Sequence, residues 1–309
     1  MIEIKNLTKK FDQFVAVNDL SFNVGEGEVL GFLGPNGAGK STTMKVITGF
    51  LSPSSGSISI DGNDVSIKPV DAKALIGYLP EGAPCYGEMT PLEFLKFIAE
   101  IRGFQGKECI NRVQNVIREV ELQKVCMQSI ETLSKGFKRR VGLAQAILHD
   151  PKVLILDEPT DGLDPNQKHH VRELIKSLAK DKIVIISTHI LEEVSAVCSR
   201  AIIIDAGRIV ADGTPEELES QSQYHNSVNV ELFAEYDLTK DLSSLTNVSL
   251  QKDSENNFTL ISKNRQPIFA DVSEIAQGNK WPISEFYVKK GQLEDVFRSV
   301  TQKTREGFE

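Results

Sequence analysis

Residues 34–42 have the types and the spacing of a phosphate-binding loop. They are Gly34, Pro35, Asn36, Gly37, Ala38, Gly39, Lys40, Ser41 and Thr42, which fit the pattern G-x-x-x-x-G-K-[ST]. Glycines let backbone N–H groups turn toward an anion without Cβ clashes, and the helix that follows directs its positive end at the phosphates. Lys40 can reach the β- and γ-phosphate oxygens of a nucleotide, and the Ser41 hydroxyl can ligate Mg²⁺. A plain strand-to-helix turn is disfavoured, because an apolar run at 29–33 precedes the loop.

Two carboxylates end a second apolar run. Residues 153–156 are Val-Leu-Ile-Leu, and Asp157 and Glu158 follow them. In phosphate-loop NTPases the aspartate at such a strand end helps to hold Mg²⁺. Glu158 is placed to accept a proton from an attacking water or to orient it. The alternative, a polar turn after a strand, is disfavoured by the phosphate loop upstream.

A second candidate anion site lies at Ser134 and Gly136, which begin a helix-compatible run to His149. Alone this signal is weak, since Ser is a good N-cap in any helix. The same run contains a basic cluster, formed by Lys135, Lys138, Arg139 and Arg140. We interpret it as a solvated or dimer-facing helix start rather than a nucleic-acid surface, because the net charge of the chain is −8.

The elements that must position these residues read as α/β up to about residue 219. Strands are predicted at 29–33, 57–60, 75–79, 153–156, 183–187 and 201–204. Several are continuous apolar runs with helical segments between them, which indicates a mostly parallel sheet. Residues 2–7 and 14–24 look instead like antiparallel strands, and 92–128 look mainly helical. Helix starts with Pro at the first position are predicted after Thr90, Asp164 and Thr214.

The composition changes after about residue 220. Residues 221–227 are polar and are predicted to be a linker. Strands near 228–232, 248–251, 258–262 and 283–289, a helix near 268–277 and a final helix through Leu293 and Val300 follow. They predict a small α+β domain, in which we recognise no catalytic constellation.

Bulk properties exclude several classes of protein. The chain has 309 residues, and no apolar run approaches the ~20 residues that a transmembrane helix needs. The N-terminus lacks the apolar core of a signal peptide. Four scattered cysteines suit a reducing compartment and argue against a zinc site or a disulfide framework. We therefore expect a cytoplasmic protein.

Together, the motifs resemble those of an ATP-binding cassette (ABC) ATPase. Besides the phosphate loop, residues 133–137 resemble the signature of that family, 156–160 its Leu-Asp-Glu-Pro-Thr segment, 161–165 its D-loop, and 187–189 its switch histidine. The motifs occur in the right order over about residues 1–219. The resemblance implies a P-loop NTPase fold for 1–219, with a mostly parallel sheet, an antiparallel subdomain and a helical subdomain at about 88–150. It implies an accessory C-terminal α+β domain at 220–309.

The resemblance also implies a mechanism. Two chains, either two copies or this chain and a related ATPase, would close around two ATP molecules with Mg²⁺. Each ATP would lie between the phosphate loop of one chain and Ser134 and Gly136 of the other. His189 would contact the γ-phosphate, and Asp164 would organise the dimer contact. Phe11 would stack on adenine, with Val17 nearby; Phe14 is a rival for that role, and core packing is the alternative for both aromatics.

Two departures from the family pattern stand out. Glu81 occupies the position where the family usually has Gln. The resemblance implies that Glu81 is a third metal ligand beside Ser41 and Asp157. Its carboxylate adds negative charge near the phosphates. The signature has Lys135 and Phe137 where the common form has a second Gly and a Gln.

The motif variants and the ending at 292–297 look like those of exporter-type ATPases that are encoded apart from their membrane subunits. The partner implied is a separate transmembrane permease, which would hold this subunit on the inner face of the cell membrane. Two rival classes are a soluble cassette ATPase that acts on ribosomes or nucleic acid, and a nucleotide-binding module that does not hydrolyse. The first usually has two cassettes or a coiled-coil insertion. The intact Lys40, Asp157, Glu158 and His189 argue against the second.

Overall fold

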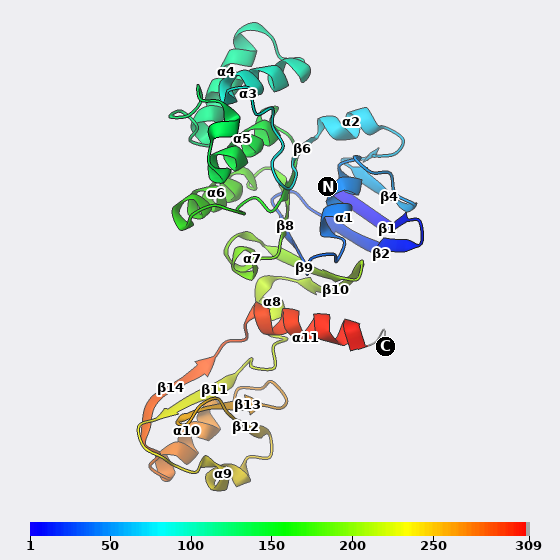
Figure 1. The fold of residues 1–309 in the computed structure, drawn as a ribbon. Helices are drawn as coiled ribbons and strands as arrows, with labels where there is room; N and C mark the ends of the chain where they lie inside the picture. Colours follow the sequence, from blue (N-terminus) through cyan, green and yellow to red (C-terminus); the bar gives the residue numbers. More distant parts are fainter. Residues whose placement is uncertain (307–309) are drawn as a thin grey trace. The chain divides into compact units, whose positions relative to one another are not determined.

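The computed structural model describes residues 1–306 and divides the chain into two compact units, Met1–Asp212 and Gly213–Glu309. The division falls a few residues before the predicted boundary at 219/220. The cause is the short helix α8 (Pro215–Glu219), which contacts the last helix, α11 (Leu293–Glu306), inside the second unit. Figure 1 shows both units as ribbons.

A six-stranded sheet forms the centre of the first unit. Its strands, in spatial order, are β10 (Arg208–Gly213), β9 (Arg200–Asp205), β3 (Val29–Leu33), β8 (Ile183–Thr188), β7 (Val153–Asp157) and β6 (Ile76–Leu79). The pairs from β9 through β6 are parallel, as the apolar runs predict. Strands β3, β7 and β8 are buried along their whole length, because helices cover both faces of a parallel sheet.

A separate antiparallel sheet belongs to the same unit. Its strands are β2 (Phe14–Val24), β1 (Ile2–Phe11), β4 (Ser55–Ile60) and β5 (Asn63–Asp64). The antiparallel pairing of β1 with β2 confirms the prediction for the first two strands. The grouping of β4 with the parallel strands was wrong. Ile58 and Ile60 alternate with serines along β4, so that only one face of the strand is apolar.

Seven α-helices complete the described part of the first unit. They are α1 (Lys40–Ile47), α2 (Pro69–Ala74), α3 (Pro91–Ile101), α4 (Gly106–Glu119), α5 (Lys135–Ile147), α6 (Pro165–Leu178) and α7 (Leu191–Val197). Helices α3, α4 and α5 pack together as the predicted helical subdomain, although turns and a 3₁₀ helix (Ile130–Thr132) fill the segment between α4 and α5 (Figure 1). Thr90 and Asp164 cap α3 and α6 through backbone N–H groups three residues on, as predicted.

The second unit has its own antiparallel sheet and core. The sheet order is β12 (Val248–Lys252), β13 (Asn257–Ser262), β11 (Ser227–Leu232) and β14 (Ile283–Lys289). Helix α10 (Phe269–Gly278) packs its buried Val272 into the core that the sheet forms. A short helix α9 (Leu238–Asp241) and a 3₁₀ helix (Leu242–Ser244) join β11 to β12. Residues 221–227, which were predicted to be a linker, lie inside the second unit, where Ser222 and Ser227 are buried and the Ser222 hydroxyl donates to Asp295.

Candidate nucleotide site

The phosphate loop joins the buried strand β3 to helix α1. Gly39 is the residue before α1 and has φ of +103°, a left-handed conformation that favours glycine. A Cβ on Gly39 would lie 2.4 Å from the carbonyl oxygen of Ala16, so no side chain fits there. The sequence therefore forms a close-packed backbone cradle at a helix N-terminus, which is the geometry that binds phosphate groups.

Lys40 lies inside this cradle with only 6% of its surface exposed. Its Nζ donates to the carbonyl oxygens of Gly34, at 2.7 Å, and of Pro35, at 3.1 Å. Burial lowers the pKa of the Lys40 ammonium, while the charges of Glu158 and Asp157 oppose that shift. The Lys40 ammonium thus donates to two uncharged carbonyl oxygens, and an anionic phosphate would be a stronger hydrogen-bond acceptor.

A cavity of about 390 Å³ opens at the loop. It brings together residues from four separate segments, and its lining is Phe14, Ala16, Asn36, Gly37, Gly39, Lys40, Ser41, Thr42, Glu81 and Glu158. The phosphate loop, Glu81 and Glu158, which the sequence analysis named separately, therefore meet at one site.

The aromatic residue that lines this cavity is Phe14 and not Phe11. The two pair directly across the turn between β1 and β2, and both are exposed, so core packing explains neither. Lys9 Nζ lies over the Phe11 ring, 5.0 Å from its centroid. Val17 has no exposed surface, and its neighbour Ala16 lines the cavity instead. The geometry favours Phe14 and Ala16 over the predicted Phe11 and Val17.

Asp157 is 1% exposed at the end of β7. Its Oδ1 accepts a hydrogen bond from the Ser187 hydroxyl, and its Oδ2 has no partner among the described residues. A buried, unpartnered carboxylate oxygen suits a cation. Together with the Ser41 hydroxyl and Glu81, it offers the oxygen ligands that Mg²⁺ prefers, which it usually completes with waters and substrate phosphates. The residues present therefore fit Mg²⁺.

Glu158 and His189 face each other across the ends of β7 and β8. His189 Nδ1 lies 2.8 Å from Glu158 Oε1. The Glu158 side chain is 19% exposed and lines the cavity, and the His189 side chain is 49% exposed. The contact orients Glu158, which lines the cavity, whereas His189 is not among the lining residues.

The interpretation of Arg139 and Arg140 as solvated or dimer-facing was wrong. Each is 6% exposed. Arg139 donates from Nη1 to the carbonyl oxygen of Pro80, at 3.2 Å, and from Nη2 to the carbonyls of Asp157 and Glu158. It thus joins helix α5 to the two segments that carry the candidate carboxylates. No motif signalled this role, because its acceptors are backbone carbonyls that are distant in the sequence.

Ser134 and Gly136 do not line the cavity of their own chain. Ser134 caps α5 by accepting a hydrogen bond from Phe137 N, 3.4 Å away, and is exposed. A Cβ on Gly136 would lie 2.3 Å from Gln167 Oε1, so the start of α5 lies closely against the start of α6, where Asp164 is the cap. The structure brings Ser134, Gly136 and Asp164 near one another and leaves them apart from the phosphate loop's cavity.

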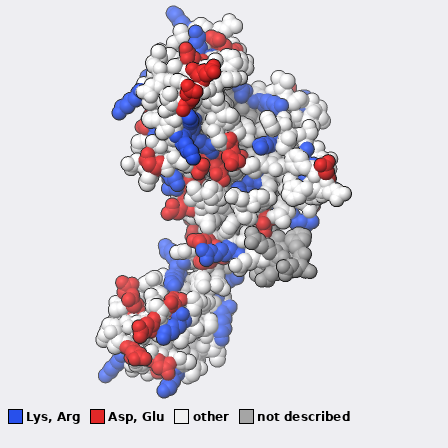
Figure 2. All heavy atoms as spheres, viewed as in Figure 1, with Lys and Arg blue, Asp and Glu red and all other residues white. Residues whose placement is uncertain are grey.

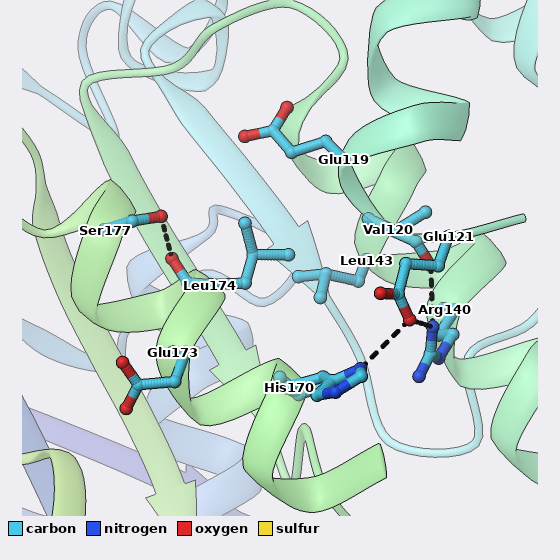
Figure 3. A pocket seen from close by; sticks show the side chains of 10 residues that line it. Glu119, Val120, Glu121, Arg140, Leu143, His170, Glu173, Leu174 and Ser177 are labelled. Carbon is cyan, nitrogen blue, oxygen red and sulfur yellow. Dashed lines mark hydrogen bonds and ion pairs between the residues drawn. The ribbon is translucent and has the colours of Figure 1, made fainter. Parts of the chain in front are cut away.

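A second cavity in the first unit, of about 270 Å³, lies between the end of α4, α5 and α6 (Figure 3). Glu121 Oε2 accepts hydrogen bonds there from Arg140 Nη1, at 2.7 Å, and contacts His170 Nδ1 at 3.0 Å. These bonds hold the Glu121 pKa below its usual range. Glu119, Glu121 and Glu173 line the cavity, which makes it unsuited to phosphate groups.

Surface charge and hydropathy add two observations. Lys and Arg are interspersed with Asp and Glu on the face drawn in Figure 2, which argues against a continuous basic track for nucleic acid. No helix among residues 1–306 is long and apolar enough to cross a bilayer.

Comparisons with known proteins find similarity to one family. The ABC transporter family model matches residues 17–161. The ABC transporter ATP-binding protein YxlF of Bacillus subtilis is 40% identical, over 72% of this chain and 74% of its own. The linearmycin resistance ATP-binding protein LnrL of the same organism is 37% identical, over 72% of this chain and 71% of its own. The dimeric post-hydrolysis structure of the cassette MJ0796, bound to ADP and Pi, has a TM-score of 0.65 and 25% identity, and covers 69% of this chain and 98% of that one.

Proposed function

The chain belongs to the ATP-binding subunits of ABC transporters and is an ATPase, and from this premise we propose that it hydrolyses ATP to drive export through a separate transmembrane permease. The observation that carries the proposal is the single cavity in which Lys40, Glu81 and Glu158 meet. The name of the similar protein LnrL, which refers to resistance to linearmycin, supports export as the direction.

In this proposal the cavity holds the triphosphate and base of ATP. The backbone N–H groups of residues 34–42 and the Lys40 ammonium bind the β- and γ-phosphates. Phe14 stacks on the adenine, with Ala16 beside it. Ser41, Asp157 and Glu81 are the oxygen donors that would hold Mg²⁺, which when bound supplies positive charge against the phosphate oxygens.

The chain's own groups then perform hydrolysis. A water attacks the γ-phosphorus, and the bond to the β,γ-bridging oxygen breaks, so that ADP leaves with that oxygen and inorganic phosphate forms. Glu158 orients the water and accepts its proton. His189 holds Glu158 through the 2.8 Å contact and would contact the γ-phosphate in the closed dimer. Lys40 balances the negative charge on the oxygens of the transferred group.

A second chain completes the site. Members of the family form dimers, as the MJ0796 structure does. Ser134 is exposed at the start of the 13-residue helix α5 and lies outside the cavity of its own chain. We infer that Ser134 and Gly136 bind the γ-phosphate of the ATP on the other chain, and that Asp164 contacts that chain. The second unit is proposed to assist dimerisation or regulation.

The permease would hold this subunit on the cytoplasmic face of the membrane. The test is co-purification of tagged protein with Glu158→Gln, in the presence of ATP, from native membranes solubilised in detergent. We expect a polytopic membrane protein to be recovered. Recovery of ribosomes or nucleic acid with no membrane subunit would overturn the proposal. The matched control is Lys40→Ala, which should lose ATP-dependent recovery.

A further inference from the structure

Glu193 is a buried acid that no motif in the sequence analysis includes. It lies on α7 and is 4% exposed. Both of its carboxylate oxygens are occupied by threonine hydroxyls: Oε1 accepts from Thr160, and Oε2 accepts from Thr188 at 2.9 Å. The two threonines are themselves 2% and 1% exposed. Burying a carboxylate costs free energy, and removing one of its hydrogen-bond partners destabilises the folded protein strongly. The two threonine hydroxyls are therefore specific partners of Glu193.

The two threonines belong to the two segments that carry the hydrolytic residues. Thr160 follows Glu158 by two positions and begins the turn that leads to Asp164, with Leu163 N donating to Thr160 O at 3.2 Å. Thr188 is the residue directly before His189. Its hydroxyl also accepts from Ile190 N at 3.0 Å, which folds the backbone around His189. One carboxylate therefore bridges the Glu158-to-Asp164 segment and the His189 segment.

The direction of the hydrogen bonds agrees with an ionised carboxylate. The Thr188 oxygen accepts from a backbone N–H, so its own hydrogen is free to donate to Glu193. Burial raises the pKa of Glu193, and the Thr188 hydrogen bond and the charges of Arg172 and Lys168 oppose that rise. Both threonine hydroxyls donate to the same carboxylate, and α7 holds Glu193 in a packed position. A displacement of one threonine is therefore transmitted through Glu193 to the other.

We propose that Glu193 is a positioning residue for ATP hydrolysis: it fixes the Glu158-to-Asp164 segment to the His189 segment and so couples movement at the dimer contact to the Glu158–His189 pair. The inference rests on the proposed roles of Glu158, His189 and Asp164. It goes beyond them in naming the group that keeps the two segments in register.

The test is a double-mutant cycle on ATP turnover by the full chain. Thr160→Val and Thr188→Val each remove one hydroxyl and keep the side-chain shape. If the link acts as one unit, breaking either end interrupts it. Each single variant should then lower kcat about tenfold with KM for ATP nearly unchanged, and the double variant should lower kcat by about the same factor. The proposal would be overturned if the kcat of the double variant fell by the product of the two single losses, or if kcat were unchanged in either single variant.

Two further variants keep the result interpretable. Thr48→Val removes another buried threonine hydroxyl of the first unit, one that donates to Lys45 O, and should leave kcat unchanged. The same cycle between Glu193→Gln and Thr160→Val replaces the double-threonine variant if that variant does not fold, and it should show the same non-additive loss. Wild-type turnover, and its loss in Glu158→Gln, test the proposed function separately.

Discussion

His189 Nδ1 lies 2.8 Å from Glu158 Oε1, although 31 positions separate the two residues in the sequence. Parallel pairing of β7 with β8 brings their carboxyl ends to one edge of the sheet, and each residue directly follows its strand. Backbone bonding reinforces the arrangement, since Glu158 N donates to Ser187 O at 2.9 Å. The arrangement of Glu158 and His189 is therefore a consequence of strand register and not of the two side chains alone.

Replacing Lys40 by alanine removes the buried ammonium from the cradle. We expect kcat for ATP to fall at least about a hundredfold, because the loss of one preorganised hydrogen-bond donor to a developing negative charge lowers kcat by about that factor. A coupled phosphate-release assay measures it, and circular dichroism controls for folding. Turnover within a few-fold of wild type would contradict the assignment of the cavity.

Phe14→Ala should weaken ATP binding, and Phe11→Ala should not. Loss of one aromatic stacking partner costs about 1–3 kcal/mol per base, which corresponds to a KM rise of roughly fivefold to 150-fold. Because the two residues pair across the same turn, Phe11→Ala is a matched control for the hairpin. A larger KM effect from Phe11→Ala would restore the original prediction.

Glu81→Gln should retain ATPase activity. The amide oxygen can still face the metal position, and the substitution removes a negative charge beside the phosphates. Steady-state turnover at saturating Mg²⁺ and ATP should stay within a few-fold of wild type. A fall to the level of Lys40→Ala would show that the carboxylate itself is required.

His149 should make the first unit sensitive to acid. Its Nε2 donates to Ile76 O at 3.0 Å, its Nδ1 is buried, and burial is the main cause that lowers its pKa from 6.5 to about 4. Between pH 4 and pH 6.5, His149 therefore binds a proton more readily in the unfolded chain than in the folded one. The stability due to neutral His149 is complete above pH 6.5 and is lost as the pH falls toward 4.

Glutamine at position 149 can still donate to Ile76 O but does not titrate. Urea unfolding at pH 7.5 and pH 5 should show a smaller acid-induced loss of stability in His149→Gln than in wild type. Every other titrating group is common to both proteins, so the difference isolates His149. Equal losses would contradict the assignment.

The strands of the central sheet were predictable because burial on both faces leaves continuous apolar runs. The phosphate loop was predictable because its backbone geometry restricts the residue types. The Ser-Ile alternation of β4 carried the correct signal of a half-buried antiparallel strand, but its place between α/β elements obscured that signal.

Other features depend on contacts that no local pattern encodes. Arg139 is charged and lies in a basic run, but its acceptors are the carbonyls of Pro80, Asp157 and Glu158. The choice between Phe11 and Phe14 depends on which side of a hairpin end faces the cavity. Glu193 was missed because its partners, Thr160 and Thr188, lie outside its own helix.

The most direct test of the account is sedimentation of Glu158→Gln with and without ATP and Mg²⁺. Without its proton acceptor, the variant should bind ATP, turn over at least about a hundredfold more slowly than wild type, and sediment as a dimer only when ATP is present. The double variant with Lys40→Ala should remain monomeric. If Glu158→Gln binds ATP and remains a monomer at high concentration, the paired-site mechanism is contradicted.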